Sequence, residues 1–268
     1  MFITTIMLIL TIFCIFSTQA APLQVETLDG PVLGSRRQHQ DTRTGQLVTW
    51  TQYRGVPYAA PPLGELRFRP PQPVDQWTQP RHVDAQQPDP ICPQIILGEL
   101  SPQSDEDCLY LNIHVPDPVS DDLLPVMVWI HGGAYRGGSG TPQSFGPEYF
   151  MGHGVVVVTI NYRLGPLGFL SLGTEDIGGN MGQLDQVAAL HWVQDNIQQF
   201  GGNPDAVTIF GQSAGAYAST YHLFSPLTRG LFKRIIAQSG VGGFGPSFHH
   251  HQEADAARLE MWILIRYY

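Results

Sequence analysis

The sequence of 268 residues predicts an α/β domain in which helices pack on the faces of a largely parallel β-sheet. Strand-like apolar runs alternate with helical patterns along the second half of the chain, as they do in βαβ units. Hydrophobic residues make up 43% of the chain, which supports a sizeable core and excludes intrinsic disorder. We see no internal repeat and no linker that would divide the chain.

The charge balance narrows the class of partner. The chain has 14 Lys and Arg against 23 Asp and Glu, which gives a formal net charge of −9. Nucleic-acid binders depend on basic residues that neutralise phosphates, and anionic membrane surfaces also attract basic segments. We therefore expect neither nucleic acid nor a membrane surface as a partner.

The first residues, 1–20, predict a secretory signal peptide. No charged residue follows the free amino terminus before Phe16, and residues 6–12 are almost all apolar. Small residues then lead to a cleavage point near Ala20 or Ala21. The apolar run is too short for a comfortable membrane span, so we expect a secreted, extracellular protein with no membrane span. A buried N-terminal element and an uncleaved anchor remain the alternatives.

Short strands are predicted before the βαβ pattern begins. Residues 23–26, 31–33 and 47–54 have strand composition, and Gly30 and Gly34 separate the first segments. A proline-rich stretch at residues 57–93 then lacks apolar periodicity. We expect it to form ordered surface loop.

The second half supplies the core strands and helices. Residues 155–160 include four valines, which is typical of a strand covered on both faces. Apolar residues step by three and four through a helix predicted at 182–200, and two glycines end it. A second helix is predicted at 213–224. The remaining strands are predicted at residues 109–115, 126–130, 206–210 and 234–237.

The strongest chemical signal is the motif Gly211-Gln212-Ser213-Ala214-Gly215, which lies between a predicted strand and a predicted helix. Its glycines permit a sharp strand-to-helix turn that presents the Ser213 hydroxyl at the helix N-terminus. We therefore predict that Ser213 is a nucleophile. The backbone N–H of Ala214 would then meet a developing oxyanion.

A second glycine motif supports that prediction. His131-Gly132-Gly133-Ala134-Tyr135 follows the strand at residues 126–130. Glycines at this point let the backbone approach a substrate, because they have no Cβ. We predict that Gly132, Gly133 and Ala214 donate the hydrogen bonds of an oxyanion hole. His131 is expected to brace the turn rather than act as a base.

Cysteine usage agrees with export. Cys14 lies in the predicted signal peptide, which leaves Cys92 and Cys108. Two cysteines in an oxidising compartment are most simply paired in a disulfide. Two free thiols are the alternative.

Several further motifs resemble those of the type-B carboxylesterases, the group that includes the cholinesterases. The family signature is matched by Glu106-Asp107-Cys108-Leu109-Tyr110-Leu111-Asn112. Other matching segments are residues 53–59, 66–68, 161–163, 179–182 and 185–186. The motifs also resemble those of insect secreted esterases, and the resemblance implies an α/β-hydrolase fold and hydrolysis of carboxylic esters. It also implies a Cys92–Cys108 disulfide and an ion pair between Arg67 and Glu106.

Two departures from the cholinesterase pattern narrow the substrate. Gln212 stands where cholinesterases carry Glu. The sequence between Cys92 and Cys108 contains no Phe, Trp or Tyr. The aromatic face that would hold a choline cation is therefore missing from that loop. We expect a neutral, apolar ester as the small-molecule substrate, with no cofactor and no metal.

The sequence resembles only the N-terminal half of the family, so we expect residues 21–268 to form an incomplete carboxylesterase type-B domain. Only 55 residues follow Ser213, whereas each further strand with its crossover takes roughly 30. In this fold the acid and then the histidine of the triad follow the serine. We therefore expect both to be absent and catalysis to be impaired. We expect His249, His250 and His251 to lie on an exposed loop.

Two consequences follow for function. A half sheet leaves one strand edge open, so a protein partner covering that edge is expected. The alternative to an esterase is a secreted, non-catalytic binding or adhesion module that keeps the esterase shape. The intact Ser213 motif argues against that alternative.

Overall fold

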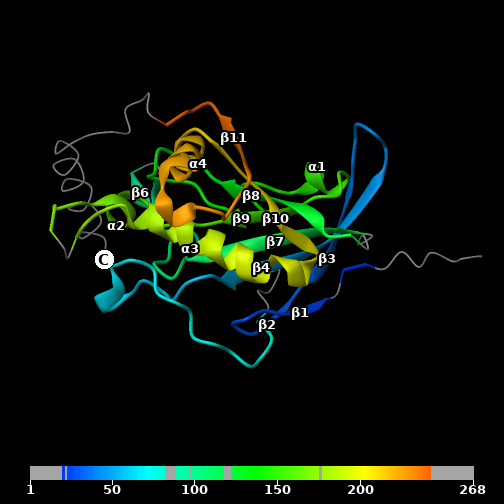
Figure 1. Ribbon diagram of the computed structural model, residues 1–268, viewed down its shortest axis with the longest axis horizontal. Coiled ribbons are helices and arrows are strands. Elements are labelled where there is room, and N and C mark those ends of the chain that lie inside the picture. The colour runs from blue at the N-terminus through cyan, green and yellow to red at the C-terminus, as the bar shows by residue number, and fades with distance from the viewer. Residues whose placement is uncertain are drawn as a thin grey trace, which may run out of the picture.

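A computed structural model describes residues 20–21, 23–81, 89–96, 98–117, 122–174 and 177–242. Figure 1 shows a central sheet with helices α3 (Met181–Asn196) and α4 (Ala214–Phe224) beside it. The predicted signal peptide up to residue 19 and the three histidines at 249–251 lie outside the described residues.

Seven strands form the main sheet in the spatial order β11-β10-β8-β9-β7-β4-β3. The parallel part consists of β8 (Leu124–Ile130), β9 (Val156–Ile160), β10 (Gly202–Gln212) and β11 (Arg234–Gln238). An antiparallel part completes the sheet with β7 (Tyr110–Asp117), β4 (Leu47–Pro57) and β3 (Ser35–Gln40). The α/β class is thus confirmed, with the sheet mixed at one side.

Smaller elements surround this sheet. Strands β1 (Gln24–Glu26) and β2 (Pro31–Leu33) pair with each other, as do β5 (Ile95–Ile96) and β6 (Glu99–Leu100). Strand β3 was not predicted, because its arginine, glutamine and histidine side chains give no apolar alternation. The described part of the proline-rich stretch contains one short helix, η1 (Gly64–Leu66).

The helices follow the prediction with one change. The helix predicted at residues 182–200 consists of α3 followed by η2 (Ile197–Phe200), and Gly201 ends it at a φ of 77°. Short helices α1 (Glu148–Met151), α2 (Gly165–Phe169) and η3 (Pro226–Thr228) occupy the loops. The predicted second helix corresponds to α4.

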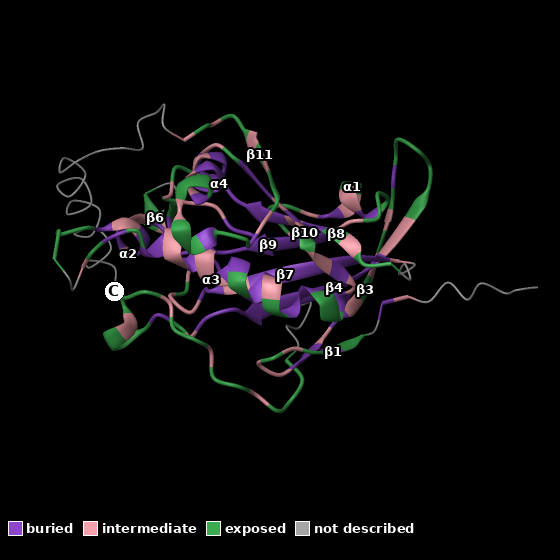
Figure 2. Cartoon of the chain, viewed as in Figure 1, coloured by how far each residue is buried: buried purple, intermediate pink, exposed green. Residues whose placement is uncertain are grey.

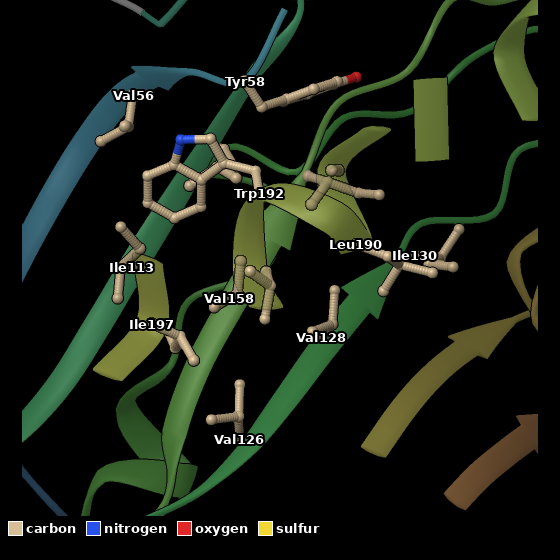
Figure 3. Packing of buried hydrophobic residues seen from close by; sticks show 14 of the residues in the cluster. Val56, Tyr58, Ile113, Val126, Val128, Ile130, Val158, Leu190, Trp192 and Ile197 are labelled. Atoms are coloured by element: carbon tan, nitrogen blue, oxygen red, sulfur yellow. The ribbon is translucent and has the colours of Figure 1, made fainter. Parts of the chain in front are cut away.

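The hydrophobic core lies between the sheet and α3. Val126, Val128 and Ile130 of β8 point toward the side of the sheet that Leu190 and Ile197 cover (Figure 3). Figure 2 shows that burial is concentrated in the sheet and on the inner side of the helices. This packing fixes the carboxyl ends of β8 and β10, where the two glycine motifs lie.

The buried face of α3 differs from the predicted apolar stripe. Leu184 and Val187 are only half-buried, whereas Asp185 and Gln186 are completely buried. The reason is electrostatic, because Asp185 lies 2.6 Å from the buried guanidinium of Arg163. A polar pair therefore occupies positions that hydrophobic periodicity alone assigns to the surface.

Candidate active site

Ser213 lies at the sharp turn between β10 and α4. Its backbone takes φ 55° and ψ −121°, a conformation that a residue other than glycine rarely adopts. The Ser213 N–H donates to the carbonyl oxygen of Gln238 on the neighbouring strand β11, at 2.8 Å. The sheet thus holds the strained backbone of Ser213 in place, and this residue remains partly exposed.

The two motif glycines leave no room for a side chain. A Cβ at Gly215 would lie 2.0 Å from the carbonyl oxygen of Ile130. A Cβ at Gly211 would lie 2.5 Å from the carbonyl group of Gly215. The first turn of α4 therefore packs directly on the end of β8, which explains why the motif needs glycine at both positions.

The loop after β8 packs on the same turn. A Cβ at Gly132 would lie 2.4 Å from the carbonyl oxygen of Gln212, so the two backbones are in direct contact. Gly133 takes a φ of 114°, and a Cβ there would lie 2.1 Å from the carbonyl oxygen of Gly137. The structure therefore brings together the two glycine motifs that the sequence singled out, although they lie about 80 residues apart in the chain.

Four main-chain N–H groups at this corner have no acceptor within the described part of the chain. They belong to the predicted donors Gly132, Gly133 and Ala214 and to Ala134. Ala134 was not predicted as a donor, and its φ of 54° is unusual for alanine. Only the backbone conformation distinguishes it, because an alanine after two glycines carries no local signal of positive φ.

The disulfide loop contacts the glycine loop that follows β8 and carries predicted oxyanion donors. Cys92 and Cys108 form a disulfide, as the resemblance implies. Within the loop that it closes, the side-chain amide of Gln94 donates to the carbonyl oxygen of Gly138 at 2.9 Å and accepts from the Gly138 N–H at 2.8 Å. The cross-link thus supports the glycine loop as well as closing its own loop.

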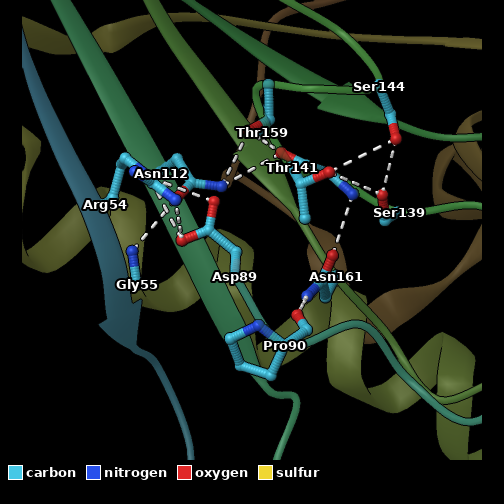
Figure 4. A network of polar contacts seen from close by, with 11 residues as sticks. Arg54, Gly55, Asp89, Pro90, Asn112, Ser139, Thr141, Ser144, Thr159 and Asn161 are labelled. Carbon is cyan, nitrogen blue, oxygen red and sulfur yellow. Dashed lines mark hydrogen bonds and ion pairs between the residues drawn. The ribbon is translucent and has the colours of Figure 1, made fainter. Parts of the chain in front are cut away.

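A buried polar network holds the continuation of this loop at Gly140 (Figure 4). The Asn112 amide donates to the carbonyl oxygen of Gly140 at 3.0 Å, and the Gly140 N–H donates to Asn161 Oδ1 at 2.8 Å. Asn112 Oδ1 also accepts from the N–H of Gly55 at 3.0 Å. Strands β7 and β4 are thereby joined to the loop that carries the predicted oxyanion donors.

His131 braces the turn, in agreement with its predicted role. Its ring is stacked on Tyr162 with a centroid distance of 4.3 Å, and its Nδ1 lies 2.8 Å from the carbonyl oxygen of Gly132. The Tyr162 hydroxyl donates to the His131 carbonyl oxygen at 2.8 Å. Burial lowers the pKa of His131 to about 4, so the ring stays neutral at physiological pH.

His222 is also committed to structure. It lies on α4 with its Nε2 2.9 Å from Gln186 Oε1, and burial lowers its pKa to about 4. Among the described residues, no imidazole hydrogen-bonds to Ser213, and no acceptor is found for the Ser213 hydroxyl. The candidate site therefore combines the predicted nucleophile with main-chain N–H groups that have no acceptor, and the described residues add no base.

Aromatic residues line one side of the glycine loop. Tyr135 follows Ala134 and packs against Phe169 of α2 with a centroid distance of 4.8 Å. The Tyr135 hydroxyl is buried without a hydrogen-bond partner, and burial raises its pKa.

Two ion pairs stabilise the surrounding loops. Arg67 and Glu106 lie 2.6 Å apart, as the resemblance implies, and the Arg67 side chain is 45% exposed. Arg163 and Asp185 lie 2.6 Å apart with side chains 3% and 0% exposed. Arg163 also donates to the carbonyl oxygen of Arg69 at 2.8 Å, so the buried pair ties the Arg67 loop to α3.

Comparison with known proteins finds a matching family and similar chains. A family profile described as "Carboxylesterase family" matches residues 21–259. Carboxylesterase 1E of Mus musculus is 46% identical over 239 residues, which cover 83% of this chain and 41% of that protein. Juvenile hormone esterase of Tribolium castaneum is 43% identical over 226 residues, which cover 84% of this chain and 37% of that protein.

A solved structure agrees with the sequence relatives. The crystal structure of juvenile hormone esterase from Manduca sexta, with OTFP covalently attached, superposes with a TM-score of 0.74 at 42% identity. The superposition covers 82% of this chain and 41% of that one. The chain thus spans well under half the length of these relatives.

Proposed function

Since this chain belongs to the carboxylesterase family and has the α/β-hydrolase fold, we propose that it carries the nucleophilic half of a carboxylic ester hydrolase site. Residues 21–268 are then the N-terminal, incomplete portion of a carboxylesterase type-B domain. The observation that carries the proposal is the strained Ser213 turn, which packs directly on the Gly132 loop.

In the reaction, the Ser213 oxygen attacks the carbonyl carbon of the ester while its proton passes to a base. The carbonyl oxygen becomes an oxyanion, held by the N–H groups of Gly132, Gly133 and Ala214. We add Ala134 to these donors because its N–H has no acceptor within the described residues. The carbon–oxygen bond to the alcohol then breaks, and water releases the acid from the acyl-serine.

Catalysis by this chain alone is slow, because the described residues bring no base to Ser213. A serine hydroxyl that keeps its proton is a weak nucleophile, and loss of a triad member costs several powers of ten in rate. The amide donors still favour the tetrahedral intermediate, so the site retains a small part of its activity.

The substrate class that the site favours is a neutral, apolar ester. Tyr135 and Phe169 present an aromatic wall beside the glycine loop. The chain between Cys92 and Cys108 has no aromatic residue to bind a cation. The same loop instead uses Gln94 to hold the backbone of Gly138.

A test compares hydrolysis of a small nitrophenyl ester by this chain and by Ser213→Ala. We expect both rates to lie near background, with a small excess for the native serine. A rapid, Ser213-dependent turnover would contradict the proposed lack of a base. Turnover that persists unchanged in Ser213→Ala would contradict Ser213 as the nucleophile.

We also propose that the open edge at β11 receives the polypeptide equivalent to the remaining part of the longer relatives. Strand β11 is the last strand of the described sheet on that side. Apolar side chains are exposed on β11, on α4 and just after each of them, namely Leu223, Phe224, Leu227, Ile236 and Val241. An unpaired edge beside exposed apolar groups favours pairing with another segment.

Co-expression with the C-terminal part of a related esterase tests this partner. Pairing predicts that the two polypeptides purify together and that Ser213-dependent ester hydrolysis rises by orders of magnitude. Recovery of the chain alone, or as a homodimer, would contradict the proposed occupant. The Ser213→Ala chain is the matched control, because it should bind equally well without gaining activity.

The second candidate is a secreted binding or adhesion module without catalysis. It is favoured by the Ser213 hydroxyl having no hydrogen-bond acceptor in the described residues. An organophosphonate probe separates the two candidates, since only an activated serine reacts quickly. Rapid labelling of Ser213 in the reconstituted pair supports the esterase, and absent labelling supports the binding module.

Secretion is proposed on the basis of the predicted signal peptide at residues 1–20. In the described part of the chain, no helix is long and apolar enough to span a bilayer. Recovery of the protein from the medium of expressing eukaryotic cells would support this localisation. Exclusive recovery from the cytosol would contradict it.

A further inference from the structure

Ala21, next to the predicted cleavage point, is held in a socket between β3 and β7. It is 1% exposed and belongs to the main hydrophobic core, whereas Ala20 is only half-buried. The backbone nitrogen of Ala21 donates to Oδ1 of Asp117 at 2.9 Å. The backbone at this point is therefore fixed by a specific acceptor as well as by packing.

The socket carries charge. The Asp117 side chain is 9% exposed and lies at the end of β7. Arg36 of β3 approaches both Asp117 oxygens at 3.1 and 3.2 Å, and it also donates to the carbonyl oxygen of Ala21. Both polar backbone groups of Ala21 are thus bound by side chains of opposite charge.

We propose that the Ala20–Ala21 peptide bond is the processing site and that the freed ammonium of Ala21 forms an ion pair with Asp117. Water adds across the bond during hydrolysis, so Ala20 leaves with a carboxylate and the Ala21 nitrogen becomes an ammonium group. The hydrogen bond to Asp117 then joins two opposite charges, which strengthens it. The inference rests on the signal peptide proposed above.

Neighbouring cleavage points fit the socket less well. A cut after Ala21 would remove the residue that Asp117 and Arg36 hold. A cut after Gln19 would place the ammonium on half-buried Ala20, one residue away from the donor to Asp117. Small residues at Thr18 and Ala20 suit the enzymes that remove signal peptides, and the family match begins at residue 21.

The N-terminal residue can be identified directly. Amine labelling can then follow the Ala21 amine, because the only lysine of the chain is Lys233, which is exposed. The full chain is expressed in eukaryotic cells with a C-terminal hexahistidine tag, purified from medium and membranes, and its N-terminal peptide is identified by mass spectrometry. We expect Ala21 as the first residue. A start at Ala20, Pro22 or another nearby residue overturns the processing site, and a retained Met1 overturns the signal peptide as well.

Amine labelling tests the ion pair separately. With a succinimidyl acetate at neutral pH, Lys233 should react at similar rates in the folded protein and in urea. The Ala21 amine should react about tenfold more slowly in the folded protein, as expected for a shift of one pKa unit. Equal rates for Ala21 in the two conditions would overturn the ion pair, whatever the variants do.

Two variants refine the second test. Asp117→Asn should bring the Ala21 rate in the folded protein close to its rate in urea, because the carboxylate is lost. Glu65→Gln removes one charge from an exposed residue of η1 and should leave the Ala21 rate unchanged. An unchanged Ala21 rate in Asp117→Asn would contradict the proposal.

Discussion

The Ser213 turn and strand β11 are neighbours in the sheet, yet they are built in opposite ways. The turn is held by close backbone contacts, and a Cβ at Gly215 would lie 2.0 Å from a carbonyl oxygen. Among the described strands, β11 pairs only with β10, and Arg234, Ile236 and Gln238 are exposed. The turn that carries Ser213 is therefore fixed by contacts within this chain, whereas β11 has a free side among the described strands, where we propose that another segment pairs.

The largest effect on stability is expected at the buried ion pair between Arg163 and Asp185. Arg163→Met should lower the free energy of unfolding by about 3–5 kcal/mol, because Asp185 would remain buried without its partner. Urea denaturation measures the change.

Arg43→Met is the matched control. Arg43 pairs with Asp41 at 3.3 Å but is 62% exposed, so its loss should leave the free energy of unfolding almost unchanged. Equal losses from the two variants would mean that the burial of Arg163 carries no special weight.

Substitution inside the nucleophile turn comes next. Gly215→Ala should lower the free energy of unfolding by about 3 kcal/mol, because the new methyl group overlaps the Ile130 carbonyl oxygen. Gly152→Ala is the control, since its nearest neighbour would be a Val48 methyl group at 4.0 Å. Thermal unfolding of both variants tests whether the turn is as tightly closed as we describe.

Lowering the pH should reduce the free energy of unfolding, because the protein buries neutral histidines. Burial lowers the pKa of His114 to about 3 and the pKa values of His131 and His222 to about 4, from an ordinary value of 6.5. Below pH 6.5 the unfolded chain takes up protons that the folded chain excludes. The free energy of unfolding should therefore fall between pH 6.5 and 4, by about 2 kcal/mol per histidine at pH 5.

Urea denaturation at pH 7 and pH 5 measures this slope. His222→Gln should reduce the difference between the two pH values by about one histidine's share, whereas replacing exposed His153 with Gln should leave it unchanged. A pH difference that is the same in all three proteins would contradict the assignment to buried histidines.

The smallest effect is expected at the open edge. Ile236→Lys should change the free energy of unfolding by no more than about 0.5 kcal/mol, because Ile236 is 44% exposed on β11. The same change should reduce aggregation, since a lysine on an edge strand opposes pairing. A loss of several kcal/mol, measured by urea denaturation, would mean that β11 is already covered.

The sequence predicted the parts of the molecule that depend on local pattern. Four valines identified the buried strand β9, and the glycines around Ser213 identified the strand–turn–helix. The proximity of the two glycine motifs followed from parallel strands, whose carboxyl ends meet at one edge of the sheet.

Other features depend on partners that are distant in the chain. Asp185 is buried because Arg163 lies 22 positions earlier, and no helical periodicity reveals that pairing. The role of Gln94 follows only from its two hydrogen bonds to Gly138. The positive φ of Ala134 likewise arises from the packed loop rather than from alanine itself.

We propose that Ser213 needs only a proton acceptor in order to react, because its turn and the neighbouring amide donors are already in place. Imidazole in the buffer can serve as that acceptor, and mass spectrometry can locate the acyl group left by an activated ester. We predict acylation of Ser213 that requires imidazole and is absent from Ser213→Ala. Rapid acylation without imidazole, or no acylation of Ser213 in its presence, would contradict this proposal.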